Sequence, residues 1–390
     1  MGMSPGLPLP LSPSSPLIGM SIVDRLLHRK SHMSVDPNYV NFTVAILIPA
    51  YNEEAMIAHT IRSCLEQTRL PNRIIVIDDM STDRTAEIVM SFSRAFPNVM
   101  LLKNNVKRGK AGGINYALNH ITEDIVMVID ADTFLHPEYC ENMIRALRFY
   151  DAAAATGYVI PYTERGNPSP FMLHRAYAYI YGHEIEKRAQ ESINGMIVLA
   201  GCAAAYKRKV LLELGGMPLE TIVEDMDLSW RFVENGYKTI YTKNAFAFTD
   251  EPENFRAYRT QLDRWYGGFF ECLHAHRSKI FKSRALTISI IFGILQGLWT
   301  PVFLAYIAYS LYVGDFLTGI LILALNFGLQ FGITAYKAAV TKRLRTILRG
   351  TIITFFLSMV DTLIWNRCAI KYGLLGKKVR TWNIGVQRAL

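Results

Sequence analysis

Val44-Ala-Ile-Leu-Ile-Pro49 is an apolar run that ends at the polar residues Tyr51-Asn52-Glu53. Such a run predicts a strand that is buried on both faces. Three similar runs follow: Arg73-Ile-Ile-Val-Ile-Asp78, Val99-Met-Leu-Leu102 and Ile125-Val-Met-Val-Ile129. Amphipathic stretches at residues 55–67, 82–96 and 110–120 lie between them and predict helices. Strands that alternate with helices in this way predict an α/β fold with a mostly parallel sheet.

Acidic residues follow three of the predicted strands. Glu53 comes after the first strand, Asp78-Asp79 ends the second, and Asp130-Ala131-Asp132 follows the fourth. Ligands of parallel sheets bind at the carboxyl ends of the strands. We therefore expect these residues to share one site.

Asp130 and Asp132 supply hard oxygen ligands that suit Mg²⁺ or Mn²⁺ shared with a diphosphate. An ordinary acidic turn is the alternative reading of this short motif. Asp79 is placed to accept a hydrogen bond from a uracil ring nitrogen. Ser81 and Asp83 fit a helix cap and a simple turn equally well.

Three further motifs carry candidate chemistry. Lys107-Arg-Gly-Lys110-Ala-Gly-Gly-Ile-Asn115 predicts a diphosphate or sugar contact at a helix start, although the P-loop spacing is absent. Glu224-Asp225 heads an amphipathic stretch over residues 226–235, and Gln261-Leu-Asp-Arg264-Trp265 follows it. These last two suit a base, an anion clamp and a stacking platform for a sugar acceptor. A helix N-cap for Asp225 and an interfacial anchor for Trp265 are the alternatives.

The order of these motifs resembles that of processive family 2 glycosyltransferases, which include the cellulose, chitin, hyaluronan and poly-N-acetylglucosamine synthases. Asp79, Asp130-Ala-Asp132, Glu224-Asp225 and Gln261-x-x-Arg264-Trp265 resemble the D, DxD, [TE]D and QxxRW series of that family. Pro49-Ala-Tyr-Asn-Glu53 and Gly109-Lys-Ala-Gly-Gly-Ile-Asn115 resemble its early motifs. The resemblance covers about residues 43–280 and implies a GT-A fold.

The resemblance also implies an inverting, metal-dependent transfer from a UDP-sugar, with UDP-N-acetylglucosamine or UDP-glucose as our choice, to a growing β-linked polysaccharide. Asp225 is then the general base beside Glu224, and Asp132 binds the metal together with Asp130. The implied nucleotide-sugar contacts are Pro49, Ala50, Tyr51, Glu53, Asp79, Lys110, Asn115, Asp130, Ala131 and Arg264. The implied acceptor contacts are Gly201, Cys202, Gln261 and Trp265.

The last third of the chain has a different composition. Residues 285–314 and 316–336 contain no charged residue, and each run exceeds the roughly 20 residues that cross a bilayer. We predict spans at 287–312 and 316–336, joined by a turn at Val313-Gly314-Asp315. A third apolar stretch, 350–366, is interrupted by Asp361. It fits a crossing, which we favour, a re-entrant segment or an interfacial helix. Core helices of a soluble protein are the alternative for the two long runs.

Basic residues flank the apolar runs. Residues 337–349 hold five basic and no acidic residues, and Lys279, Lys282 and Arg284 precede the first run. This pattern predicts an integral membrane protein of the cell membrane with a cytoplasmic catalytic domain and contacts to anionic lipids. The formal charge of +9 is not arranged as a basic surface interleaved with aromatic residues, so a nucleic-acid partner is not expected.

The chain divides into three predicted regions: residues 1–40, 41–284 and 285–390. The first region contains five prolines in its first twenty residues, which predicts a disordered leader. Ile22–Lys30 fits an interfacial helix and an ordinary surface helix equally well. The five cysteines form no CxxC pair, so we expect reduced thiols and no zinc site.

Two rival functions follow from these features. Many family members have spans before the catalytic domain, and none is predicted here. A channel would then need the C-terminal spans, supplemented by a second copy or another membrane subunit. The small membrane region favours a transferase that adds one sugar to a lipid-linked or protein acceptor. A catalytically dead membrane scaffold is the remote alternative, and the intact set of acids argues against it.

Overall fold

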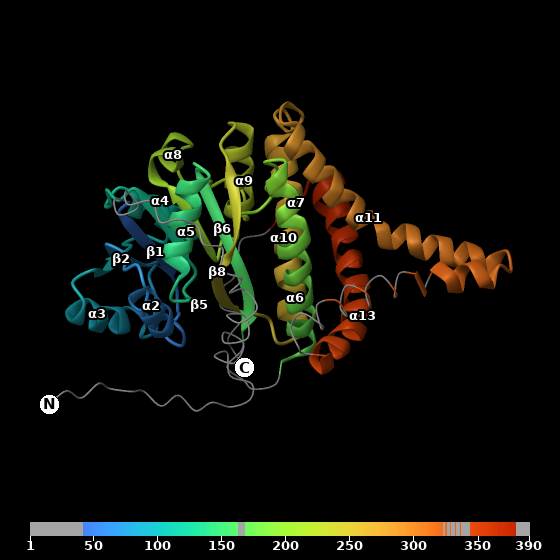
Figure 1. The fold of residues 1–390 in the computed structure, drawn as a ribbon, viewed down its shortest axis with the longest axis horizontal. Helices are drawn as coiled ribbons and strands as arrows, with labels where there is room; N and C mark the ends of the chain where they lie inside the picture. Colours follow the sequence, from blue (N-terminus) through green and yellow to red (C-terminus); the bar gives the residue numbers. More distant parts are fainter. Residues whose placement is uncertain are drawn as a thin grey trace.

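The computed structural model describes residues 42–162, 168–322 and 344–379, with isolated positions between 324 and 336. The leader and helix predicted within residues 1–40, most of the second predicted span and the tail from Arg380 lie outside the described residues. The described chain forms an α/β domain beside a group of long helices (Figure 1).

The first four strands lie where the apolar runs predict them: β1 (Val44–Ala50), β2 (Arg73–Asp78), β3 (Val99–Lys103) and β4 (Ile125–Ile129). Their three pairings are parallel. The connecting helices are α2 (Ile57–Leu65), α3 (Thr85–Ala95) and α4 (Gly109–Leu118). Ile46 and Ile48 of β1 pack on the side of α2, whereas Ala45 and Leu47 pack on the side of α4. Both faces are covered, which explains why the strand is apolar throughout.

The second half of the sheet is mixed. The strand order is β3-β2-β1-β4-β7-β6-β8-β5. β7 (Ala203–Lys207) runs antiparallel to β4 and to β6 (Ala154–Tyr162), β8 (Thr239–Asp250) runs parallel to β6, and β5 (Thr133–Leu135) runs antiparallel to β8. Four of the seven pairings are therefore parallel.

Three helices complete the cover of the sheet: α5 (Tyr139–Phe149), α8 (Arg208–Glu213) and α9 (Glu224–Glu234). The N-cap of α9 is Val223, so the reading of Asp225 as an N-cap is wrong. Asp225 instead lies in the first turn of this helix.

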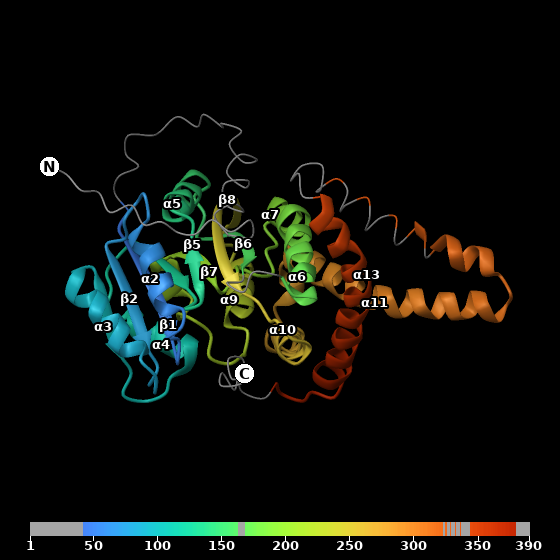
Figure 2. The ribbon, with the colours of Figure 1, turned by 90° about the horizontal axis from the view of Figure 1, so that it is seen from below.

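A second group of helices stands beside the β8 side of the sheet (Figures 1 and 2). It contains α6 (Pro170–Tyr181), the π-helical turn η2 (Gly182–Glu186), α7 (Lys187–Ser192), α10 (Phe255–His276), η3 (Ile280–Lys282), α11 (Arg284–Tyr312), α13 (Leu344–Cys368) and η4 (Ala369–Leu374). Leu286 of α11, Trp365 of α13 and Leu262 of α10 share one buried cluster with Trp230 of α9, a helix of the α/β domain. The C-terminal helices therefore pack directly on the domain.

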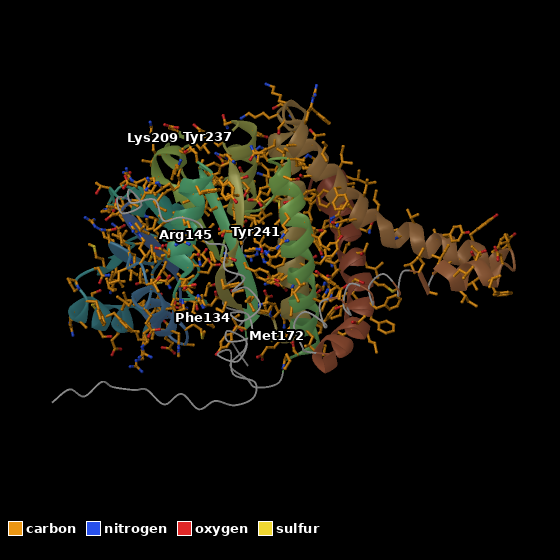
Figure 3. All side chains as sticks on the ribbon, in the orientation of Figure 1. Phe134, Arg145, Met172, Lys209, Tyr237 and Tyr241 are labelled. Carbon is orange, nitrogen blue, oxygen red and sulfur yellow. The ribbon has the colours of Figure 1, made fainter. Side chains whose placement is uncertain are left out.

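α11 continues through Tyr312, as the apolar run predicts, and ends at a turn where Gly314 has a φ of +77°. A new helix begins at Phe316. Figures 1 and 2 show this hairpin extending away from the rest of the molecule, and Figure 3 shows its side chains projecting around it. Ile288, Leu295 and Val302 are more than half exposed.

One helix within the described residues, Gly350–Leu374, is long and apolar enough to cross a membrane, judged by length and composition alone. Its inner face packs on α6, α10 and α11. Asp361, which interrupts this apolar stretch, lies on that inner face. Its carboxylate contacts His174 Nε2 at 2.9 Å and accepts a short hydrogen bond from the Tyr258 hydroxyl. The aspartate thus joins α13 to α6 and α10.

Candidate active site

A cavity of about 1870 Å³ opens at the carboxyl ends of β1, β2 and β4 and continues to α10, α11 and α13. It brings together residues that are more than 200 positions apart in the sequence, such as Glu53 and Trp265. The predicted site residues that line it are Pro49, Ala50, Tyr51, Glu53, Asp79, Lys110, Asp130, Ala131, Asp132, Gly201, Cys202, Glu224, Asp225, Gln261, Arg264 and Trp265.

Asn115 is the exception among the predicted site residues. Its side-chain amide donates to Met217 O at 2.8 Å and accepts from Met217 N at 2.7 Å. A Cβ at Gly216, where φ is +82°, would lie 2.4 Å from Asn115 Oδ1. Asn115 therefore holds this turn against α4 and is not among the residues that line the cavity, and its contact with the nucleotide sugar stays a prediction.

At one end of the cavity, Asp79 fixes the loop that enters α4. Its carboxylate accepts hydrogen bonds from Asn104 Nδ2 at 2.8 Å, Arg108 N at 2.8 Å and Gly109 N at 2.9 Å. Lys107, from the same loop, places its ammonium 3.6 Å from the ring centre of Tyr51. Tyr51 and Asp79 therefore meet one loop and frame one end of the site.

Ser81 and Asp83 join the loops after β1 and β2. Ser81 Oγ accepts a hydrogen bond from Asn52 N at 3.0 Å. Asp83 accepts from Thr85 N at 2.9 Å, at the start of α3, and from Glu54 N at 3.1 Å. These two residues thus fix the edge of the site as well as the helix start.

Lys110 lies between the acids of the two halves of the site. Its Nζ contacts Asp130 Oδ1 at 2.6 Å and Glu224 Oε1 at 3.2 Å, and donates to Gly201 O at 3.1 Å. Burial opposes the lysine charge, but Asp130 and Glu224 outweigh it and raise the pKa of Lys110. The lysine is therefore a fixed cation that links β4, α9 and the loop before β7.

Asp225 is held by backbone donors on both carboxylate oxygens. Oδ2 accepts from Gly201 N at 3.0 Å and Oδ1 accepts from Met226 N at 2.8 Å. A Cβ at position 201 would lie 2.7 Å from Asp225 Oδ2, so this close approach requires glycine. Burial, followed by the neighbouring Glu224 carboxylate, raises the pKa of Asp225. A carboxylate that is oriented and made more basic in this way is suited to accept a proton.

Gln261 and Trp265 of α10 also line the cavity, and both contact Arg175, a residue that no sequence motif indicated. Arg175 Nη2 donates to Gln261 Oε1 at 2.8 Å, and its guanidinium lies 4.5 Å from the Trp265 ring centre. The buried Glu251 carboxylate lies 3.7 Å from Arg175 Nε and accepts a short hydrogen bond from the Tyr179 hydroxyl. The tryptophan therefore has a rigid cationic support.

His276, at the end of α10, forms hydrogen bonds with two acidic residues of α9. Nδ1 donates to Glu234 Oε1 at 2.8 Å and Nε2 donates to Asp227 Oδ1 at 3.1 Å. Burial opposes the imidazolium charge, but the hydrogen bonds that the ring donates to Asp227 and Glu234 raise the pKa of His276 to about 9. A charged histidine thus connects the helix of Asp225 to the helix of Trp265.

The sequence profile described as "Glycosyl transferase family 2" matches residues 45–215, the part of the chain that contains the first four strands and the Asp130-Ala131-Asp132 motif. The chain contains a family 2 glycosyltransferase domain. Glu224, Asp225 and Gln261 lie beyond the matched residues, yet the fold brings them to the same cavity.

Similar curated proteins include synthases of polysaccharides. Hyaluronan synthase from Streptococcus pyogenes serotype M1 is 26% identical over 271 residues, which are 66% of this chain and 64% of that protein. Poly-beta-1,6-N-acetyl-D-glucosamine synthase from Staphylococcus epidermidis is 25% identical over 300 residues, which are 75% of this chain and 69% of that protein. The match thus spans less than two thirds of the hyaluronan synthase.

The fold is also found in a solved structure, that of a mannosyltransferase from Pyrobaculum calidifontis in complex with GDP-mannose and Mn²⁺. It superposes with a TM-score of 0.59 at 21% identity, and the match covers 87% of this chain and 94% of that one. This likeness concerns the fold, and it extends past the family 2 domain to the C-terminal helices.

The donor set of the family 2 domain fits a divalent cation shared with a diphosphate. Asp130 already binds a cationic group, the Lys110 ammonium, and Asp132 lines the same cavity. Within the described residues, no group of three or more histidine, cysteine, aspartate or glutamate ligands is gathered. Mg²⁺ commonly takes one or two protein carboxylates and completes its shell with phosphate oxygens and water. Asp130 and Asp132 supply such a set.

Within the described residues the cysteines agree with the prediction of reduced thiols. All five are free, and four of them are buried. Cys202 is half-buried at the cavity, where burial, followed by the nearby Asp130 carboxylate, raises the pKa of its thiol. A neutral thiol of this kind is an inert part of the wall.

Proposed function

We propose that this protein is an inverting, metal-dependent membrane glycosyltransferase that transfers a sugar from a UDP-sugar to a growing β-linked carbohydrate. The observation that carries the proposal is that Asp79, Asp130, Asp225 and Trp265 all line one cavity. We assign Asp79 and Asp130 to the donor, Asp225 to proton transfer and Trp265 to the acceptor. UDP-N-acetylglucosamine and UDP-glucose are the donors we favour, and the similarity to a poly-N-acetylglucosamine synthase supports the first.

In this mechanism Asp225 accepts the proton of the acceptor hydroxyl as that oxygen attacks the anomeric carbon. The nucleoside diphosphate leaves from the opposite face, so the configuration inverts and an α-linked donor yields a β-linked product. Gly201 N–H orients the Asp225 carboxylate, and Arg264 faces the diphosphate side. A cation held by Asp130 and Asp132 would neutralise the charge that develops on the leaving group.

Lys110 adds a fixed positive charge to the same region. Its ammonium contacts Asp130 and Glu224 and holds the Gly201 carbonyl, so it supports both the donor acids and the loop that orients Asp225. We assign Lys110 a role in binding the donor diphosphate as well.

The membrane assignment rests on the outer faces of the C-terminal helices. Ile352, Phe356 and Leu363 of α13 are more than half exposed and recur at helical spacing, and the exposed face of α11 is also apolar. The inner face of α13 packs on α6 and α10, which carry the charged residues Arg175 and Asp263. A helix that spanned the bilayer would draw these charges into hydrocarbon. We therefore propose that the α11 hairpin enters the membrane and that α13 lies along its cytoplasmic surface.

A second candidate function is the addition of a single sugar or a short chain to an acceptor. The observation that favours it is the contact between α11 and α13, where the Trp365 ring lies directly against the backbone of Gly297. A Cβ at Gly297 would come within 2.4 Å of the indole. The two helices leave no passage at this point.

The metal role is tested by donor binding and turnover together. We expect purified protein to release UDP from its donor only with Mn²⁺ or Mg²⁺, and we expect Asp132→Ala to lose turnover and the metal-dependent part of UDP binding in calorimetry. Glu87→Ala, on the exposed face of α3, is the matched control and should behave as wild type. Full turnover in excess EDTA would refute the metal role.

A further inference from the structure

The cavity extends beyond Trp265 into a chamber between α11 and α13 whose wall is polar. Ser289 and Gln296 of α11 and Thr354 and Ser358 of α13 line it. The outer faces of the same helices are apolar and exposed, as at Leu295, which is 59% exposed. Helices that are apolar outside and polar inside enclose a hydrated or hydroxyl-bearing ligand more readily than a lipid.

Two hydroxyl groups in this wall are buried without a hydrogen-bond partner among the described residues. They belong to Ser289, which is 4% exposed, and Thr354, which is 3% exposed. An unsatisfied buried hydroxyl costs stability, so native proteins rarely keep one without a reason. Both residues line the cavity. A ligand that carries its own hydroxyl groups would satisfy them.

The opposite wall comes from the π-helical turn η2. Glu186, the last residue of that turn, accepts a hydrogen bond from Gln296 Nε2 at 2.7 Å, which ties the turn to α11. π-Helical turns inside longer helices frequently mark functional sites. The chamber therefore presents a carboxylate, an amide and hydroxyls in the same cavity that Trp265 lines, the combination of groups that binds sugars.

Trp365 forms the end of the chamber. Its indole is 8% exposed, lies against Gly297 of α11 and meets Phe270 of α10 with ring centres 5.2 Å apart. Asn366 Nδ2 also donates to Gly297 O at 3.0 Å. Among the residues whose side chains the structure describes, Gly297 and Trp365 are the last of α11 and of α13 that line the cavity. The indole thus fills the space where α10, α11 and α13 meet.

We propose that this chamber binds the sugar units of the acceptor that lie behind the reacting unit, and that Trp365 sets how many of them it holds. The proposal rests on the glycosyl transfer proposed above and goes beyond it by assigning an acceptor subsite to the C-terminal helices. It treats the chamber as a pocket of finite depth rather than an open passage.

The two hydroxyls provide the first test. We expect Ser289→Ala and Thr354→Ala to raise the KM for an oligosaccharide acceptor of the donor's own sugar by about threefold to tenfold each, with kcat little changed. The thermal stability of both variants should stay the same or rise, because each change removes an unsatisfied group. A residue with a purely structural role would lower Tm instead. An unchanged KM in both variants would overturn the assignment.

Trp365 provides the second test. With acceptors of increasing length, KM should fall until the chamber is filled and then level off. Trp365→Ala should move that plateau, and the product ladder seen by mass spectrometry, to longer acceptors by at least one unit, because an indole and a pyranose ring are of similar size. Phe356→Ala, on the exposed face of the same helix, is the control and should match wild type.

The donor assay distinguishes a failure of the proposed function from a failure of the chamber proposal. If wild-type protein releases UDP from no donor, the proposed function itself fails. If wild-type protein transfers sugar and Trp365→Ala gives the wild-type plateau and ladder, only the chamber proposal fails. Should Trp365→Ala not fold, Trp365→Leu, which keeps an apolar filler, must still lengthen the ladder for the proposal to stand.

Discussion

Single charged residues connect parts of the site that lie far apart in the chain. Lys110 contacts Asp130, Glu224 and the carbonyl of Gly201, which come from β4, α9 and the loop before β7. The sequence placed Lys110 at a helix start near the ligand, but its partners depend on long-range packing that no local pattern contains. The same is true of Asn115, whose motif suggested a ligand contact and whose amide closes a turn.

His276 makes stability depend on pH at the residue scale. Its folded pKa, raised to about 9 by Asp227 and Glu234, exceeds its ordinary value of 6.5. The stabilisation is therefore complete below pH 6.5 and is lost as pH rises through about 9. We expect the Tm of wild-type protein to fall by several degrees over this window relative to His276→Asn, in thermal unfolding at matched pH values. Parallel pH profiles for the two proteins would contradict the assignment.

At the scale of elements, the first four strands and their helices follow from the sequence because each strand is buried on both faces and reads as a continuous apolar run. The later strands could not be predicted from their sequence in this way. β5 has only three residues, and β8 includes Thr242, Lys243 and Asn244, which interrupt its apolar pattern. The π-helical turn η2 carries no sequence signal, so the wall that it forms in the cavity was not predicted.

The contact between α6 and α10 supports the residues that we propose as the acceptor platform. Arg175 on α6 supports both Gln261 and Trp265 on α10. We expect Arg175→Lys to lower transfer to an acceptor by about tenfold or more, because lysine keeps the charge near Glu251 but loses the planar stack and the fork. UDP release without acceptor should be nearly unchanged.

Two measurements complete the Arg175 test. Tryptophan fluorescence should change in Arg175→Lys, since the guanidinium over Trp265 is lost. Arg145→Lys, which alters a surface pair with Glu141 within α5, is the matched control. Equal transfer rates in Arg175→Lys and Arg145→Lys would show that the platform does not need Arg175.

At the scale of the whole molecule, the proposed function assigns lipid contact to the α11 hairpin and substrate contact to the inner face of α13. The sequence indicated the apolar stretches but not their different relations to the domain. Asp361 shows why: on the sequence it interrupts a span, whereas in the fold it joins α13 to His174 and Tyr258. The three-dimensional structure is needed to distinguish these two interpretations of Asp361.

This arrangement predicts the labelling pattern of intact cells. A cysteine at Gly314, in the turn of the hairpin, should react with an impermeant thiol reagent, because the proposed orientation takes the hairpin across the bilayer. A cysteine at Leu70, exposed on the catalytic domain, should react only after lysis. The opposite pattern would reverse the orientation and place the site outside the cytosol.

We propose that Asp225 acts as the base in sugar transfer from a nucleotide sugar. The most direct measurement compares UDP release and product formation by wild type and Asp225→Asn, with UDP-N-acetylglucosamine and UDP-glucose in the presence of Mn²⁺. We predict turnover of at least one donor by wild type, and a loss of about 10²-fold or more in the variant with UDP binding retained. Near-wild-type turnover in Asp225→Asn, or cleavage of neither donor by wild type, would contradict the account.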